Sequence, residues 1–173
     1  MPLRLSTIAL DGAGLSLLAH LPANPLAYIR GGDGLVGWGE AVRLEAHGAN
    51  RIQELSAQWQ ALAAEAKVDD QVKLPGSGLV AFGSIAFADS SETSSALIVP
   101  KVLLGLRDGR AWLTTVELDA QGHTVDVSGA GKFWETPTPC VTNSPVALHS
   151  GAQSASAFKT SVEKAVAEPE KAG

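Results

Sequence analysis

Residues 79–115 contain the pattern that most restricts how this chain can fold. The segment reads LVAFGSIAFADSSETSSALIVPKVLLGLRDGRAWLTT and predicts strands over 79–87, 96–106 and 111–118. The first run is apolar on both faces, which indicates a central strand that is covered on both sides. Pro100 cannot donate to a ladder, so the second strand is expected at a sheet edge or at a bulge. The polar residues 88–95 predict a loop, and residues 107–110 predict a turn.

A β-hairpin is expected before this segment. Two strand-like runs, 26–30 and 35–44, flank the turn residues GGDG at 31–34. Glu40 falls among the apolar positions of the second run, so its carboxylate must be paired, exposed at a rim or placed at the edge of a site. We favour a paired or exposed carboxylate, with a basic residue such as Arg43 or Arg30 as its partner.

Two helices are predicted. The first begins near Asn50, with Gln53 at the position of a capping box, and ends before the polar cluster at 69–71. Its apolar stripe consists of Ile52, Leu55, Trp59 and Leu62. The second helix covers residues 155–168, and Pro169 is expected to stop or kink it. Its apolar face consists of Ala155, Phe158, Val162, Ala165 and Val166.

The order of these elements is hairpin, helix, three strands, a long loop over 120–151 and a final helix. Without a repeat or a regular βαβ alternation, this order favours an α+β fold with a largely antiparallel sheet and two or more helices packed on it. We expect a sheet-and-helix subdomain over 1–151, followed by a helical segment over 152–173. Three tryptophans, Trp38, Trp59 and Trp112, fall on inferred core faces, so packing explains them better than ligand stacking.

Composition excludes several classes of function. The 173 residues carry a net charge of −5, with no basic run interleaved with aromatics, which argues against nucleic-acid binding. The single Cys140 can form no internal disulfide, and no Cys/His spacing suits a structural zinc site. The opening MPLRLSTIAL is interrupted too early for a signal peptide, and no apolar run is long enough to cross a bilayer. We therefore expect a cytoplasmic protein without a membrane partner.

The motifs that suggest chemistry have simpler explanations. Residues 32–37 match G-x-G-x-x-G, but a strand pattern follows where a phosphate-binding helix should begin, so a turn is predicted. Gly131-Lys132 lacks the rest of a P-loop. The histidines His20, His47, His123 and His149 show no metal-site spacing. His149, Ser154 and Asp126 could form a triad only on paper, because no nucleophile elbow exists. Nothing nearby in the sequence lowers the pKa of Cys140, so the residues alone show no catalytic set.

Several segments nevertheless resemble the N-terminal portion of isochorismate synthases, within the larger group of chorismate-utilising enzymes. They are GLVGWGEAVRL at 34–44, the strand at 79–87, LIVPKVLLGLRDGRAWLTT at 97–115 and the helix ASAFKTSVEKAVAE at 155–168. Their order and spacing carry the resemblance, which covers most of the chain. Pro169 departs from the family pattern, in which the helix continues through that position.

The resemblance implies an isomerase that converts chorismate to isochorismate with Mg²⁺, for menaquinone or siderophore biosynthesis. The composition, rich in Ala and Gly, indicates a bacterial source. In the family, a lysine activates water, a glutamic acid protonates the leaving hydroxyl, and carboxylates hold the metal. These groups have no matching position here and are expected beyond residue 173. The chain is thus expected to be an inactive N-terminal fragment that contains no catalytic, cofactor-binding or metal-binding residue. It also lacks the Leu-Leu-Glu-Ser signature of a tryptophan feedback site.

An alternative reading is a stand-alone domain without catalysis that binds a small ligand or a protein. A half-enzyme should expose apolar sheet surface where its C-terminal half belongs, and should self-associate through it. A self-sufficient module should instead be monomeric, with its sheet fully covered.

Overall fold

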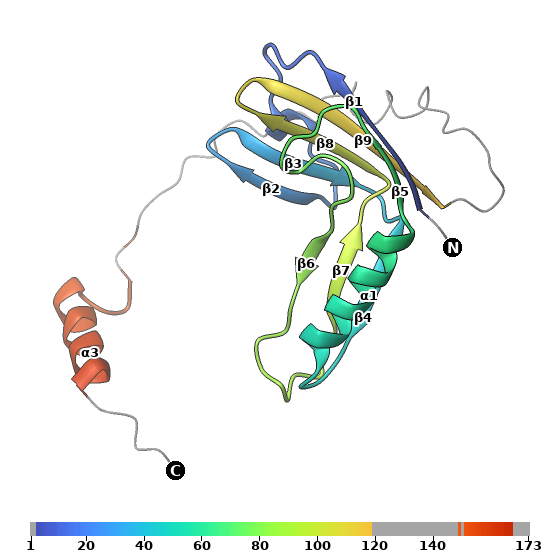
Figure 1. Cartoon of the computed structure of the whole chain (residues 1–173). Helices are drawn as coiled ribbons and strands as arrows, with labels where there is room; N and C mark the ends of the chain where they lie inside the picture. The colour runs from blue at the N-terminus through green and yellow to red at the C-terminus, as the bar shows by residue number, and fades with distance from the viewer. Residues whose placement is uncertain (1–2, 119–148, 150, 168–173) are drawn as a thin grey trace. The chain divides into compact units, whose positions relative to one another are not determined.

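A computed structural model of the chain describes residues 3–118, 149 and 151–167. It divides into two units, Met1–Cys140 and Val141–Gly173, and each is described by itself. The described part of the first unit contains two β-sheets, the helix α1 (Arg51–Glu65) and the short 3-10 helix η1 (Leu17–His20) (Figure 1). The second contains the helix α3 (Ala155–Ala167).

The larger sheet has six strands. Their spatial order is β2 (Leu26–Arg30), β3 (Asp33–Trp38), β8 (Val102–Arg107), β9 (Arg110–Leu118), β1 (Leu3–Leu10) and β5 (Lys67–Asp70). All neighbours are antiparallel except β1 and β5. The smaller sheet is antiparallel, in the order β4 (Val42–Ala46), β7 (Ser95–Val99) and β6 (Phe82–Ser84). The predicted α+β fold with a largely antiparallel sheet is confirmed.

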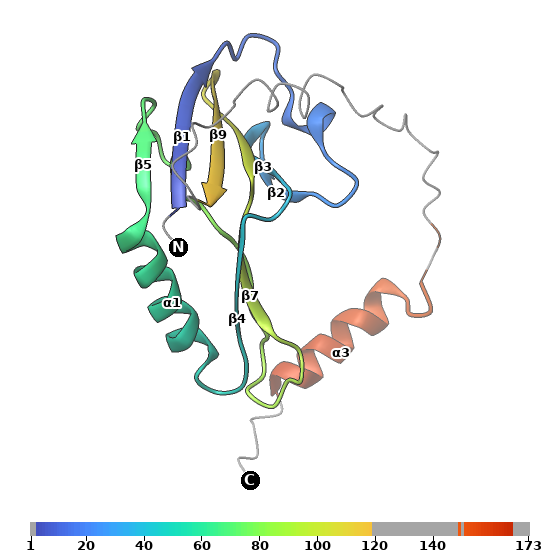
Figure 2. The same ribbon diagram turned by 90° about the vertical axis from the view of Figure 1, so that its right-hand side faces the viewer.

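A separate core covers each face of the larger sheet. On one face, Val36 and Leu104 pack with Leu17 of η1. On the other, Leu3 and Leu5 of β1 pack with side chains of α1 that include Trp59 and Leu62. Figure 2 shows α1 below β5 and alongside β4 and β7 of the smaller sheet. The central strands are therefore covered on both faces, and the predicted core placement of Trp38, Trp59 and Trp112 is confirmed.

Two of the expected strands are each divided between the two sheets. The run 35–44 forms the end of β3 and then β4, and the run 96–106 forms β7 and then β8. Both breaks occur at one place, because Lys101 N donates to Trp38 O at 3.0 Å and Ala41 N donates to Val99 O at 2.8 Å. Gly39 permits the bend in the first run with a φ of +64°. Pro100 lies at the second bend, so it separates two strands rather than forming a bulge within one.

The prediction of a covered central strand over 79–87 is wrong. Only β6 forms a strand there, at the edge of the smaller sheet, and the side chain of Phe87 is fully exposed. Leu79 and Ala81 pack against the core on the α1 side. The apolar character of this run therefore arises because part of it covers another sheet.

The start of α1 is held by Arg51 rather than by a capping box. Asn50 stands at the N-cap position but makes no side-chain capping bond. The buried Arg51 guanidinium donates to the carbonyls of Gly48, Ala86 and Phe87, and pairs with Asp89 at 2.6 Å. These bonds tie the predicted polar loop at 88–95 to the helix. The stripe is confirmed at Leu55, Trp59 and Leu62, whereas Ile52 is exposed.

The end of α1 also differs from the expectation. The helix stops at Glu65, and Asp69 and Asp70 of the polar cluster belong to β5, which runs parallel to β1. In the second unit, α3 confirms the predicted final helix, and it has no buried residue. No helix in the described residues is long and apolar enough to cross a membrane.

Trp112 packs on a glycine of the neighbouring strand. Gly105 pairs with Trp112 in the β8–β9 ladder, and a Cβ atom at Gly105 would overlap the indole ring. The indole Nε1 donates to Gly76 O at 3.2 Å, which fixes the ring between the sheet and the loop that precedes residue 78. The indole therefore occupies the space that a side chain at position 105 would fill.

Gly105→Ala should destabilise the first unit by about 2 kcal/mol, because the methyl group forces the indole out of its place. The measurement is urea unfolding followed by tryptophan fluorescence. Gly151→Ala is the control, since a Cβ there meets no atom within 4 Å. Equal midpoints for Gly105→Ala and the unmodified chain would contradict this packing.

Candidate functional site

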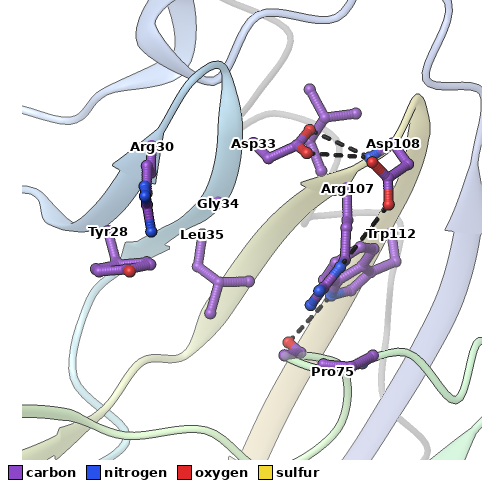
Figure 3. A pocket seen from close by; sticks show the side chains of 11 residues that line it. Tyr28, Arg30, Asp33, Gly34, Leu35, Pro75, Arg107, Asp108 and Trp112 are labelled. Carbon is purple, nitrogen blue, oxygen red and sulfur yellow. Dashed lines mark hydrogen bonds and ion pairs between the residues drawn. The ribbon is translucent and has the colours of Figure 1, made fainter.

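A pocket of about 460 Å³ lies between two hairpin turns of the first unit. The β2–β3 hairpin supplies Tyr28, Arg30 and Leu35, and the β8–β9 hairpin supplies Arg107 and Trp112. Pro75 and Gly76 close one side (Figure 3). The volume lies within the range of small-molecule sites.

Strand alternation explains why these side chains meet. In β2, Tyr28 and Arg30 are two residues apart and share a face. Tyr28 pairs with Leu35 across the β2–β3 ladder, and Leu35 pairs with Gly105 of β8. Trp112, opposite Gly105, completes this row. One row across the sheet is therefore aromatic and apolar, and the charged residues lie in the next row towards the turns.

The two turns that border the pocket hold each other in place. The β8–β9 turn has positive φ at Asp108 (50°) and Gly109 (73°), as a type I′ hairpin turn requires. Both carboxylate oxygens of Asp33, at the β2–β3 turn, lie 3.2 Å from the backbone N of Asp108 and accept its hydrogen bond. The predicted turn at 107–110 is thus confirmed, and the hydrogen bond from Asp108 N to Asp33 connects it to the β2–β3 hairpin.

The charges at the rim are only partly neutralised within the described residues. Arg107 Nε lies 4.0 Å from an Asp108 carboxylate oxygen, at the limit of an ion pair. The side chain of Arg30 makes no hydrogen bond or ion pair within the described part of the chain. In Figure 3 the two guanidinium groups lie on either side of Leu35. The pocket therefore offers cationic donors beside an apolar floor, which suits binding of an anion and provides no nucleophile with an adjacent base.

The loop that carries Pro75 and Gly76 is organised by Asp70. Its carboxylate accepts hydrogen bonds from the backbone N of Val72 and Lys73 and lies 2.6 Å from the Ser77 hydroxyl. Partial burial raises the pKa of Asp70, but these hydrogen bonds outweigh burial and lower that pKa below its usual value. This carboxylate therefore stabilises the pocket wall in its ionised form.

A second hollow of about 440 Å³ lies at the place where the chain passes between the sheets. Its lining includes Glu40, Lys101 and Glu117. Glu40 accepts hydrogen bonds from Nε and Nη2 of Arg43 at 2.8–3.1 Å, and these bonds raise the pKa of Arg43. The interpretation of Glu40 as a paired, exposed carboxylate with Arg43 as its partner is confirmed.

The other sequence candidates that fall within the described residues do not assemble into a site. The G-x-G-x-x-G match at 32–37 lies in the β2–β3 turn and in β3, with no helix after it, so the predicted turn is confirmed. Ser154 Oγ accepts a hydrogen bond from Ala157 N at 3.2 Å, which is the geometry of a helix cap. Asp126, Cys140, His123 and Gly131-Lys132 lie outside the described residues. Within those residues, no group of three or more His, Cys, Asp or Glu could hold a metal ion.

The comparison with protein families decides the broader assignment. A family model described as chorismate binding enzyme matches residues 24–172. The chain belongs to this family. The match spans every residue that lines the pocket, whereas β1 lies before it. No curated protein and no solved structure matches the chain.

This membership confirms the wider group of chorismate-utilising enzymes that the sequence resembles. No pocket residue was predicted to bind a ligand: Trp112 was assigned to the core, residues 31–34 and 107–110 to turns, and Arg30 was a possible partner of Glu40. The alternation in LAYIR was a usable signal, because it places Tyr28 and Arg30 on one face. The approach of Arg107 and of the loop at 75–76 depends on pairings between distant segments and had no local signal.

Asp70→Asn should destabilise the first unit by about 1 kcal/mol at neutral pH, because it removes the charge from the carboxylate that accepts the hydrogen bond of the Ser77 hydroxyl. Because the folded-state pKa of Asp70 is lowered from 3.8, its contribution is complete above that pH and is lost as pH falls through the folded pKa. The difference between variant and unmodified chain should therefore vanish in acid. Urea unfolding at a series of pH values measures it.

Asp69→Asn is the matched control, because it removes the same charge from an exposed side chain one residue away. A loss of stability that is equal in the two variants at every pH would contradict the role given to Asp70.

Proposed function

We propose that this chain forms the N-terminal portion of an isochorismate synthase, which isomerises chorismate to isochorismate with Mg²⁺. Family membership over residues 24–172 carries the proposal. The segments GLVGWGEAVRL and LIVPKVLLGLRDGRAWLTT, which resemble isochorismate synthases, narrow it to this reaction. Menaquinone and siderophore biosynthesis both consume the product, and a cytoplasmic, bacterial setting belongs to the same proposal.

The described residues would serve this enzyme as framework. The two covered faces of the larger sheet give a rigid wall, and the hairpins at its end position the pocket. We assign no magnesium ligand to these residues, because they contain no suitable group of carboxylates. In this proposal the water-activating lysine, the proton-donating glutamic acid and the metal carboxylates belong to a segment beyond residue 173. Magnesium, when bound there, would neutralise and orient the substrate carboxylate.

The exposed apolar side chains bear on this arrangement. Among the described residues they include Phe158, Val162 and Val166 of α3 and Ile85 and Phe87 before β7, whereas the central strand β9 exposes only one large apolar side chain, Leu118 at its end. An amphipathic helix with this exposure favours association with a further surface. In the isochorismate synthase proposal, the C-terminal portion of the enzyme would supply this surface.

A second candidate is a stand-alone small-ligand-binding domain of the same family. The pocket near Arg30 and the sheet that is covered on both faces favour it, because both are features of a self-sufficient module. This candidate predicts ligand binding without turnover.

Two measurements distinguish the two proposed functions: an assay of chorismate turnover and the intact mass of the natural polypeptide. We expect a native polypeptide longer than 173 residues that forms isochorismate with Mg²⁺ and loses this activity when the metal is chelated. The 173-residue chain alone should be inactive. Product is resolved by liquid chromatography, with anthranilate formation in the presence of ammonia as the control for a different chorismate reaction.

A natural product of 173 residues with no turnover, alone or with added cell extract, would remove the enzyme proposal in favour of the binding domain. Turnover by the 173-residue chain itself would refute the placement of the catalytic groups beyond its end.

A further inference from the structure

We propose that the pocket between the β2–β3 and β8–β9 turns binds a small aromatic monocarboxylate. This goes beyond the proposed reaction, because chorismate is a dicarboxylate with a non-aromatic ring. The inference rests on the two guanidinium groups at the rim, the apolar floor and the charge of the rim as a whole.

The guanidinium groups are placed to bind one carboxylate. Arg30 on β2 and Arg107 on β8 lie on either side of β3, so their strands are about 10 Å apart. Both side chains are long enough to converge over Leu35, and Figure 3 shows one guanidinium on each side of that residue. Within the described residues the Arg30 guanidinium has no partner, and that of Arg107 has only the 4.0 Å contact with Asp108. An anion between them would therefore gain charge-assisted hydrogen bonds without breaking a short ion pair.

The floor of the pocket favours a flat ring. Tyr28, Leu35 and Trp112 form it, and the Trp112 Nε1–H is already satisfied by Gly76 O. Trp112 is only 1% exposed, so its indole supports the floor from beneath and offers no free donor. The exposed ring of Tyr28 beside Leu35 offers stacking and edge contacts that an aromatic ring uses better than a puckered one.

The charge of the rim favours a single negative charge. Asp33 and Asp108 balance Arg30 and Arg107, so the lining is neutral as a whole. The Asp33 carboxylate accepts the hydrogen bond of Asp108 N at the turn. A monoanion can bind near the guanidinium groups and away from these carboxylates, whereas the second charge of a dianion would be repelled by them.

The test is a titration of the ¹⁵N-labelled 173-residue chain with benzoate, followed by the Trp112 indole N–H and the Gly34 and Gly76 amide signals. We expect saturable shifts of these three signals. Arg30→Gln and Arg107→Gln should each weaken binding about tenfold, because each removes a charge-assisted interaction. Both arginines are exposed, and the remaining spectrum of each variant shows whether it is folded.

Arg110→Gln is the matched control. It removes the same charge from the same hairpin, but Arg110 does not line the pocket, so the affinity should change by less than about twofold. An equal loss in Arg110→Gln would show a general attraction of anions to the hairpin and would overturn the site. The absence of saturable shifts with benzoate would overturn it as well.

Three further ligands test the chemical class. Benzamide lacks the charge, cyclohexanecarboxylate lacks the aromatic ring, and phthalate adds a second carboxylate. Each should bind more weakly than benzoate, and equal or tighter binding of any one would refute the corresponding part of the proposal. Chorismate turnover is measured separately, so failure of the isochorismate synthase proposal leaves this result unaffected.

Discussion

The packing of Trp112 on Gly105 joins the parts of the first unit that matter for its function. Trp112 is a residue of β9, and its indole fills the space that a side chain at Gly105 of the neighbouring β8 would occupy. The indole also donates its N–H to Gly76 O in a distant loop. Burial of a tryptophan ring is a large favourable contribution, and the bond to Gly76 removes the cost of burying its polar N–H. The same ring then forms part of the pocket floor. Core stability and pocket shape therefore depend on one contact.

The sequence predicted elements that local chemistry determines. The Asp108-Gly109 turn, β2, β9, α1 and α3 follow from turn residues or apolar periodicity. Prediction from the sequence failed for elements whose structure depends on pairing with segments that are distant in the chain. The first strand, β1, was weighed only as a possible targeting segment, although Leu3, Leu5 and Thr7 alternate inward. The short charged strand β5 forms because the edge of β1 is available to it, and no local pattern announces it.

The division of two runs between the sheets shows the same limit. Gly39 and Pro100 were visible as irregularities, but their joint effect depends on the hydrogen bonds Lys101 N to Trp38 O and Ala41 N to Val99 O. Each bend satisfies backbone groups that the other bend would leave unpaired. The pocket was likewise outside local inference, since Arg30 and Arg107 are brought together by the order of β2, β3 and β8. The ion pair of Glu40 with Arg43 was predictable because it joins residues three apart.

The helix α3 poses a different energetic question. Thirteen residues is near the length below which an isolated helix is marginal in water. Its Phe158, Val162 and Val166 are exposed, and burying three such side chains is worth about 5 kcal/mol, which is comparable to the stability of a small domain. The contacts that stabilise this helix are therefore expected from a surface that takes up its apolar face. In the isochorismate synthase proposal the helix and the catalytic portion need each other, because the helix gains burial from the same packing that completes the enzyme.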